Sequence, residues 1–153
     1  MRLSDLAISS IERLAPSNST ILELGSGFGT EILLNKGYEL ISIEQNKDWQ
    51  FKHHDNYIAA PLKKYKDYWW FDSDYLAQIK NLSYDFLLID GPTGDPIPEF
   101  DNCRIGILDN LHFFNLSLPI LVDDINRKDE KVIFNKLSEG RKSEDFNDFG
   151  LIY

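Results

Sequence analysis

Short apolar runs alternate with helix-like stretches along this chain, and this alternation constrains the fold more than any other feature of the sequence. Such an order predicts βαβ units, in which helices connect the parallel strands of one sheet. We therefore expect an α/β fold with a central, mostly parallel sheet flanked by helices. The expected strands are 20–24, 39–43, 57–60, 85–89 and 120–122, with a last strand or tight hairpin in the C-terminal FNDFGLIY. The expected helices are 3–14, a helix from the glycines to about Lys36, 46–54, about 73–82, 103–114 and 129–137, and GPTGDPIPEF is expected to be a loop.

The composition limits the class of protein. A chain of 153 residues is the usual size of one domain, so we expect a single domain over 1–153. The one cysteine, Cys103, allows no intramolecular disulfide framework and favours a cytoplasmic protein. No apolar stretch approaches the roughly 18 residues that cross a bilayer, so we expect no membrane partner. The net charge of −9 would repel phosphodiester backbones, which argues against long nucleic acid as a partner.

The stretch TILELGSGFGT places Gly25, Gly27 and Gly29 directly after the first expected strand. In an open α/β sheet, ligands bind beyond the carboxyl ends of the strands. Glycines allow a positive φ and a close approach of the backbone, and the amides at the start of the next helix favour polar or anionic groups. A dinucleotide-binding loop has the pattern G-x-G-x-x-G, whereas here the third glycine comes one residue early. The spacing therefore favours another ligand, with a tight strand–helix turn as the alternative.

Two carboxylates narrow the choice of ligand. Glu23 precedes the glycines, where it suits a ligand with a positive end better than a pyrophosphate. Glu44 ends the second expected strand, where a carboxylate can accept both hydroxyls of a ribose. Together they predict a nucleoside with a cationic tail that carries no phosphate. S-adenosylmethionine fits this description, because it joins adenosine to a sulfonium and an ammonium group.

The stretches ELGSGFGT and ISIEQN resemble motifs one and two of the class I S-adenosylmethionine-dependent methyltransferases. The resemblance implies a three-layer Rossmann-like fold, here with a compact C-terminal edge. It implies that the glycines line the methionine part, that Glu23 lies near the ammonium, that Glu44 holds the ribose, and that Gln45 and Ala60 border the adenine. The whole implied cofactor-binding set is Glu23, Gly25, Ser26, Gly27, Gly29, Thr30, Glu44, Gln45, Ala60 and Asp90.

A second group of carboxylates follows two further strands. Asp90 lies in IDGPTG after one strand, and Asp123 and Asp124 lie in LVDDINR after the next. The carboxyl ends of neighbouring parallel strands meet at one crevice, so we expect the three side chains to converge and at least one pKa to rise. A divalent metal such as Mg²⁺ or Mn²⁺ would relieve the repulsion and could lower the pKa of an acceptor hydroxyl. We predict Asp90 and Asp123 as catalytic residues and all three aspartates as metal ligands.

The same aspartates are also consistent with purely structural roles. Asp90 can cap the turn at Gly91, and Asp123 and Asp124 can cap the following helix or pair with Arg127. Arg104 and Arg127 are equally consistent with binding an acidic group of the acceptor and with pairing to the nearby aspartates. The aromatic stretch YKDYWWFDSDY favours packing or an oligomer contact over a platform for a sugar ring.

The aspartate motifs add a second resemblance. They are similar to the metal-dependent O-methyltransferases of the catechol type, and IDGPTGDPIPEF, NCRIGIL and LVDDINRKDE resemble, in their order, the glucuronic-acid 4-O-methyltransferase family. These resemblances imply methyl transfer to an oxygen of a small or carbohydrate-like acceptor. The alternatives are a metal-independent N-methyltransferase, a degenerate methyltransferase fold that acts as a binding subunit, and a nicotinamide-dependent oxidoreductase. Because little chain follows the strand at 120–122, an incomplete sheet edge could also favour a homodimer.

Overall fold

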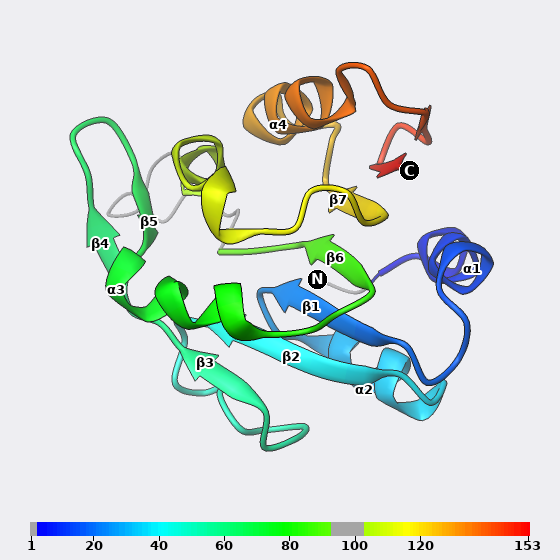
Figure 1. The fold of residues 1–153 in the computed structure, drawn as a ribbon, viewed down its shortest axis with the longest axis horizontal. Coiled ribbons are helices and arrows are strands. Elements are labelled where there is room, and N and C mark those ends of the chain that lie inside the picture. The colour runs from blue at the N-terminus through cyan, green and yellow to red at the C-terminus, as the bar shows by residue number, and fades with distance from the viewer. Residues whose placement is uncertain (1–2, 93–102) are drawn as a thin grey trace.

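The computed structural model describes residues 3–92 and 103–153, which form one seven-stranded sheet with helices and a separate two-stranded hairpin (Figure 1). The helices are α1 (Asp5–Leu14), α2 (Phe28–Asn35), α3 (Ser73–Leu76) and α4 (Lys128–Ser138), with the 3-10 helices η1 (Ala77–Asn81), η2 (Arg104–Asp109) and η3 (Leu111–Phe113). The strands are β1 (Thr20–Leu24), β2 (Glu39–Glu44), β3 (Tyr57–Ala59), β4 (Leu62–Lys64), β5 (Trp69–Phe71), β6 (Phe86–Ile89), β7 (Ile120–Asp123), β8 (Ser143–Asp145) and β9 (Phe149–Ile152). Most of the expected loop GPTGDPIPEF, residues 93–100, lies outside the described part of the chain.

The central sheet confirms the predicted mixed α/β class and the mostly parallel arrangement. Its strand order is β3-β2-β1-β6-β7-β9-β8. The five strands from β3 to β7 in this order pair in parallel, whereas β9 pairs antiparallel with both of its neighbours. The register aligns Leu24 of β1 with Ile43 of β2 and Ile89 of β6. The residues that follow these strands therefore share one edge of the sheet, where ligands bind in open α/β folds.

Two hydrophobic clusters cover opposite faces of the sheet. Side chains alternate between the faces of a strand, so Ile21 of β1 packs with one cluster and Leu22 with the other. The cluster around Ile21 includes buried residues of α1 and α2. The other cluster includes Trp70 and Phe71 of the hairpin, both fully buried, together with residues of η1, η2 and α4. The aromatic stretch thus serves packing at these two positions.

The predicted helix over 46–54 is wrong, because this segment forms turns. The Asn46 side chain accepts a hydrogen bond from the Asp48 amide at 2.9 Å, which gives the backbone a local alternative to helical bonding. Phe51 adopts a positive φ of 55°, which no α-helix tolerates. By contrast, α2 ends close to the expected residue, and Gly37 follows it with the expected left-handed conformation.

The two predicted helices on the side of the sheet that carries the β4–β5 hairpin are correct only in part. The expected helix over about 73–82 is one turn of α3 followed by η1. The expected helix over 103–114 consists of the 3-10 helices η2 and η3, which meet at Asn110. The Asn110 side chain donates to the Gly106 carbonyl at 2.8 Å, and Gly106 packs so closely on Trp70 that an added Cβ would lie 2.7 Å from the tryptophan side chain. Tertiary packing against the hairpin therefore determines this backbone.

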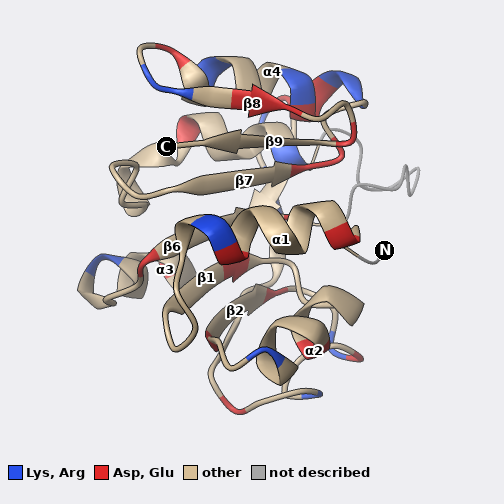
Figure 2. Ribbon diagram, turned by 90° about the vertical axis from the view of Figure 1, so that its right-hand side faces the viewer, with Lys and Arg blue, Asp and Glu red and all other residues tan. Residues whose placement is uncertain are grey.

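The C-terminal residues complete the sheet. β9 fills the position beside β7, and β8 forms the outer edge, so the expected hairpin near FNDFGLIY is confirmed. The edge strand is short, and its acidic side chains pair with cations of α1 and α4: Glu144 with Arg13, and Asp145 with Lys131. Figure 2 shows acidic residues on β8 and basic residues on both α1 and α4. Such an edge is protected from pairing with another strand. The sheet edge therefore gives the homodimer prediction no support.

In the described ranges 3–92 and 103–153, every helix falls short of the length and apolar character that crossing a bilayer requires.

Candidate functional site

The glycine loop connects β1 to α2 and packs directly on the loop after β6. Gly25 has a φ of 88°, a conformation that favours glycine. A Cβ built on Gly25 would lie 2.9 Å from the Gly91 Cα, and a Cβ on Gly91 would lie 2.6 Å from the Gly25 Cα. The Gly25 amide donates to the Ile43 carbonyl at 2.8 Å, and the Asp90 amide donates to the Leu24 carbonyl at 3.0 Å. The loops after β1, β2 and β6 therefore form one compact backbone unit.

The other two glycines of the motif differ in their surroundings. Gly27 is the N-cap of α2, and its amide donates to the Thr30 hydroxyl at 2.9 Å. Gly29 lies inside the first turn of α2 and is buried. A Cβ on Gly29 would lie 3.0 Å from the Leu3 side chain, so close packing of α2 on the N-terminal segment explains this glycine.

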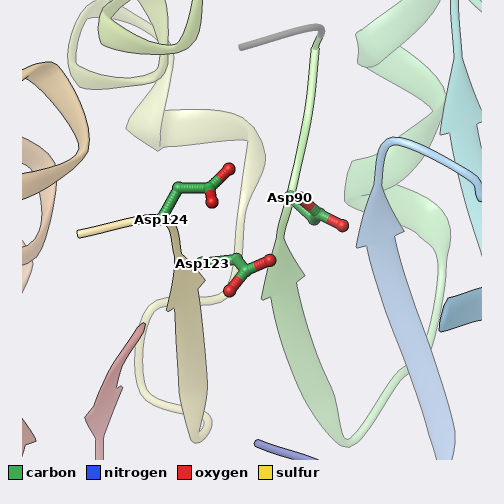
Figure 3. Close-up of side chains that lie close together, drawn as sticks. All are labelled: Asp90, Asp123 and Asp124. Atoms are coloured by element: carbon green, nitrogen blue, oxygen red, sulfur yellow. The ribbon is translucent and has the colours of Figure 1, made fainter. Parts of the chain in front are cut away.

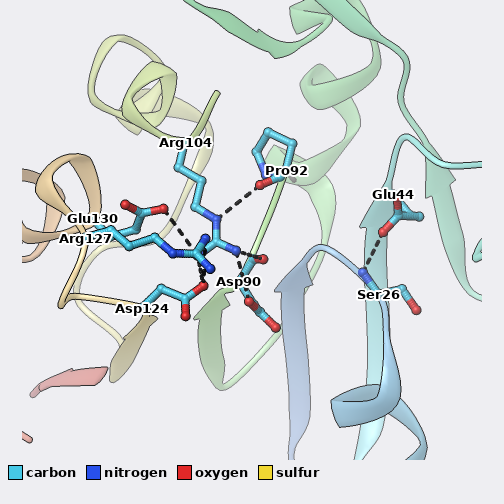
Figure 4. A network of polar contacts seen from close by, with 8 residues as sticks. All are labelled: Ser26, Glu44, Asp90, Pro92, Arg104, Asp124, Arg127 and Glu130. Carbon is cyan, nitrogen blue, oxygen red and sulfur yellow. Dashed lines mark hydrogen bonds and ion pairs between the residues drawn. The ribbon is translucent and has the colours of Figure 1, made fainter. Parts of the chain in front are cut away.

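Glu44 ends β2 and joins the glycine loop to the next turn. Its Oε2 accepts from the Ser26 amide at 2.7 Å, as Figure 4 shows, and its Oε1 accepts from the Asn46 amide at 2.6 Å. Only 3% of the residue is exposed. Burial raises the pKa of the Glu44 carboxyl, and these amide hydrogen bonds oppose the rise. Gln45 follows with a buried Oε1 that has no hydrogen-bond partner in the described part of the chain, and the predicted adenine contact Ala60 is fully buried.

Glu23 lies within β1, and its carboxylate points into the protein. It is 1% exposed, and its Oε1 accepts hydrogen bonds from the hydroxyls of Thr30, at 2.9 Å, and Ser42. Burial raises the pKa of Glu23 to about 8, against the effect of these hydrogen bonds, and the charges of Asp90 and Glu44 add to the rise. The carboxyl that the sequence assigned to an ammonium therefore has protein hydroxyls as its close neighbours.

The three predicted aspartates do lie together. Asp90 follows β6, Asp123 ends β7, and Asp124 comes next (Figure 3). One carboxylate oxygen from each lies within 4.8 Å of the other two. Burial raises the pKa of Asp90 to about 7; Arg104 opposes this rise, and Asp123 and Asp124 add to it. Burial, and then the charge of Asp124, also raise the pKa of Asp123.

Arg104 of η2 lies between the carboxylates of Asp90, Asp124 and Glu130, as Figure 4 shows. Its Nη1 donates to Asp124 Oδ2 at 3.0 Å and lies 3.6 Å from Glu130 Oε1. Its Nη2 donates to both Asp90 Oδ1 at 3.2 Å and the Asp90 carbonyl at 2.6 Å, and its Nε donates to the Pro92 carbonyl at 3.1 Å. The side chain is 5% exposed. A planar guanidinium suits such a set of acceptors, because each of its three nitrogens has a hydrogen-bond acceptor here.

Asp124 has an unusual backbone and a second cationic partner. Its φ of 59° is rare for a residue other than glycine, and such outliers persist only where their surroundings hold them. Its carboxylate lies 3.2 Å from Arg127, and its carbonyl accepts from the Arg127 amide at 2.8 Å. Both arginines therefore pair with aspartates, which was one of the two possibilities that the sequence left open.

A pocket of about 460 Å³ lies at the start of α4, and none of the three aspartates lines it. It contains Arg127, the partner of Asp124, and the cations Lys128 and Lys131 of α4. Its full lining is Ile125, Asn126, Arg127, Lys128, Lys131, Asp145 and Asn147. Its volume is in the range of small-molecule sites.

Sequence reasoning missed Glu130 as a member of the cluster and the hydroxyl contacts of Glu23. Glu130 lies in the first turn of α4, where an acidic residue is ordinary. Nothing in its local sequence distinguishes it from Asp129.

Comparison of the chain with models of protein families and with curated proteins found no match.

Proposed function

We propose that this protein is an S-adenosylmethionine-dependent methyltransferase that methylates an oxygen of a small or carbohydrate-like acceptor. One observation carries the proposal: the Ser26 amide of the glycine loop donates to Glu44 at the end of β2, at 2.7 Å. This contact brings the two cofactor motifs together at the sheet edge where ligands bind in α/β folds. The hydrophobic clusters on both faces of the sheet support a three-layer, Rossmann-like arrangement.

The residues at this edge fit an adenosyl ligand in their chemistry. Each oxygen of Glu44 accepts one backbone hydrogen bond and keeps further acceptor capacity, so both oxygens can take a ribose hydroxyl. The unpartnered Oε1 of Gln45 can accept from an exocyclic amine such as that of adenine. The residues that would hold the ligand are Gly25, Ser26, Gly27, Gly29, Thr30, Glu44, Gln45, Ala60 and Asp90. Glu23 is left out of this set because its Oε1 already accepts hydrogen bonds from the Thr30 and Ser42 hydroxyls.

The aspartates would remove the proton from the acceptor hydroxyl. When bound, S-adenosylmethionine supplies an electrophilic methyl group on a sulfonium. Asp90, with a pKa of about 7, can accept the proton that an acceptor hydroxyl loses, since a general base works best with a pKa near the operating pH. Asp123 adjoins it with a pKa raised by burial. Arg104 donates from Nη2 to both the Asp90 carboxylate and the Asp90 carbonyl, and its charge limits how far the pKa of Asp90 rises.

Asp90, Asp123 and Asp124 are also the residues that would hold Mg²⁺ or Mn²⁺. Their oxygen donors and mutual spacing suit a hard cation. Arg104 nevertheless supplies positive charge of the kind that a metal would provide, and this observation favours methyl transfer without a metal. Methyl transfer measured with Mg²⁺ and with a chelator separates the two. Loss of turnover with the chelator would support the metal, and equal turnover would support the guanidinium.

The pocket beside Arg127 is our candidate for the acceptor. Arg127, which lines it, pairs with Asp124 of the acidic cluster, and the pocket volume suits a small molecule or one sugar unit. Its cations would favour an acceptor with a negative group, although Asp145 also lines it.

Calorimetric titration of S-adenosylhomocysteine into the protein tests the cofactor assignment. We expect micromolar binding to the unaltered protein and at least tenfold weaker binding to Glu44→Ala, a loss of about 1.4 kcal/mol. Glu39→Ala is the matched control, because Glu39 is exposed at the opposite end of the same strand. Melting curves of both variants separate a loss of contact from a loss of fold.

Each outcome separates the proposal from its rivals. No binding to the unaltered protein would overturn the assignment, and stabilisation by a nicotinamide dinucleotide instead would favour an oxidoreductase. Binding without methyl transfer to any of a panel of small alcohols, amines and sugars would favour a binding subunit. Transfer to amines alone would favour the N-methyltransferase.

A further inference from the structure

Six polar side chains form a continuous hydrogen-bonded chain beneath the glycine loop. Two branches meet at one oxygen, Oε1 of Glu23. The first branch runs from the start of β3 through the glycine loop to α2, and the second runs from the segment before β3 to β2. The members are Tyr57, Ser26 and Thr30 in the first branch and His54 and Ser42 in the second, with Glu23 between them. The outer ends also touch, since the His54 and Tyr57 rings stack with centroids 4.4 Å apart.

Counting donors fixes the direction of the first branch. Thr30 has one hydroxyl proton, which it donates to Glu23 at 2.9 Å. The 3.1 Å contact between Ser26 and Thr30 must then be donated by Ser26. With the Ser26 proton used, the 2.7 Å contact between Tyr57 and Ser26 must be donated by Tyr57. Every proton in this branch points toward Glu23.

The second branch has the same direction. Ser42 uses its one hydroxyl proton on Glu23, so the 2.7 Å contact with His54 must be donated by the His54 Nε2. The other ring nitrogen, Nδ1, accepts from the Asn56 amide at 3.1 Å and therefore carries no proton. This requires a neutral His54 protonated on Nε2, and burial indeed lowers the pKa of His54.

We propose that Glu23 is a positioning residue. Its Oε1 is the common acceptor of both branches and thereby fixes Ser26 and Gly27 in position for the adenosyl ligand. Glu23 itself makes no charged contact with the ligand. Thr30 is the link, because it accepts from the Gly27 amide at 2.9 Å while it donates to Glu23. The inference rests on the proposed function, since it assigns how the cofactor loop is held. It replaces the role near the ammonium that the sequence predicted for Glu23.

The surroundings of Glu23 support a neutral anchor. The residue is 1% exposed, and burial raises its pKa to about 8, so at pH 7 most molecules carry it uncharged. An uncharged carboxyl still accepts through its carbonyl oxygen, which is the only group that the two branches require. A glutamine side chain offers the same acceptor at nearly the same position.

The test compares Glu23→Gln, which keeps the acceptor, with Glu23→Met, which removes it at similar size. The probe is S-adenosylhomocysteine, titrated calorimetrically at pH 7. We expect Glu23→Gln to bind within about threefold of the unaltered protein and Glu23→Met to bind at least tenfold more weakly. Tyr57→Phe, which removes one donor at the far end of a branch, should weaken binding by about fivefold. Tyr65→Phe is the control, because the Tyr65 hydroxyl donates to the Phe71 carbonyl and accepts from the Ser73 amide, and neither group belongs to the chain around Glu23.

Hydrogen exchange of the Ser26 and Gly27 amides in the unliganded protein gives a second readout that needs no ligand. We expect faster exchange in Glu23→Met and Tyr57→Phe and unchanged exchange in Glu23→Gln and Tyr65→Phe. Equal loss of binding in Glu23→Gln and Glu23→Met would overturn the proposal in favour of a charged contact. Unchanged exchange in Tyr57→Phe would also overturn it. Failure of the unaltered protein to bind, with the expected exchange pattern intact, would overturn the methyltransferase assignment and leave the anchoring role of Glu23 standing.

Discussion

Replacing Arg104 with methionine should destabilise the fold far more than the loss of a single exposed charge would. The guanidinium is 5% exposed and lies within 3.6 Å of Asp90, Asp124 and Glu130. Methionine has a similar length and no charge, so the variant keeps much of the packing and leaves these buried carboxylates without their shared cation. Removing one partner of a buried ion pair costs about 3–5 kcal/mol.

That cost is large for a chain of this size. Total folding free energies are about 5–15 kcal/mol, and 1 kcal/mol lowers the melting temperature of a domain of this length by about 2–4 °C. We therefore expect Arg104→Met to melt about 6–20 °C lower than the unaltered protein at pH 8. Acidification should reduce the deficit, because the stranded carboxyls can then be protonated. Asp90 already has a pKa of about 7 with the arginine in place, so much of the recovery should appear by pH 5.

Arg127→Met is the matched control. The Arg127 side chain is 29% exposed and pairs with Asp124 alone among the described residues, so its loss should cost no more than about 1 kcal/mol. Thermal unfolding followed by circular dichroism at pH 5 and pH 8, with urea titrations for the free energies, measures both variants. Equal deficits for the two variants at pH 8 would refute the claim that Arg104 compensates the cluster. A deficit in Arg104→Met that does not shrink at pH 5 would refute the electrostatic explanation.

Two further predictions concern the glycine loop and its surroundings. The folded pKa of Glu23 is raised, so its contribution to stability is complete below pH 4.5 and is lost as the pH rises through about 8. Between pH 5 and pH 9, urea titrations should show that the free energy of unfolding falls by roughly 2–4 kcal/mol less in Glu23→Gln than in the unaltered protein. An equal fall in both proteins would contradict this prediction. Gly91→Ala should lower the free energy of unfolding by about 3 kcal/mol, because the added Cβ would clash with the Gly25 backbone. This variant should also bind S-adenosylhomocysteine more weakly. Gly140→Ala, with open space around it, should lose about 1 kcal/mol and bind normally.

The sequence predicted the sheet well because the signals for strands are local. Apolar runs that end at a glycine or an acidic residue mark where these parallel strands end, and this rule alone places Gly25, Glu44 and Asp90 at one edge. The convergence of Asp90 with Asp123 followed from the same rule, since neighbouring parallel strands share their carboxyl edge. Such inferences require only the order of elements and the direction of the strands.

The helical segments on the hairpin side were less predictable because tertiary contacts determine their backbone. The position of Arg104 depends on η2, and η2 packs through Gly106 against Trp70 of a hairpin that the sequence reasoning did not foresee. No local pattern indicates whether an arginine there faces a ligand or an aspartate. Only the packed structure brings its guanidinium to Asp90.

Glu23 differs from Arg104, because the local sequence around Glu23 did indicate that its side chain faces the protein interior. It lies inside the run TILEL, two residues after Ile21, and alternate residues of a strand share a face. The Ile21 face is covered by α1 and α2, so a carboxyl on that face must find partners within the protein. Glu44, by contrast, is the last residue of its strand and lies where the sheet opens. Position relative to the strand end therefore separates the proposed anchor, Glu23, from the proposed ligand contact, Glu44.

Backbone contacts join the two halves of the candidate site. Gly25 and Gly91 are in backbone contact, and the Asp90 amide donates to the Leu24 carbonyl at 3.0 Å. Any shift of the glycine loop must therefore shift the backbone that carries Asp90, whose carbonyl and carboxylate are both held by Arg104. A ligand that settles the loop would thus also settle the proposed base, with no separate conformational step. This coupling is the physical reason to expect that Gly91→Ala, although it changes no side chain that we propose to hold the ligand, weakens the binding of S-adenosylhomocysteine and displaces the proposed base together.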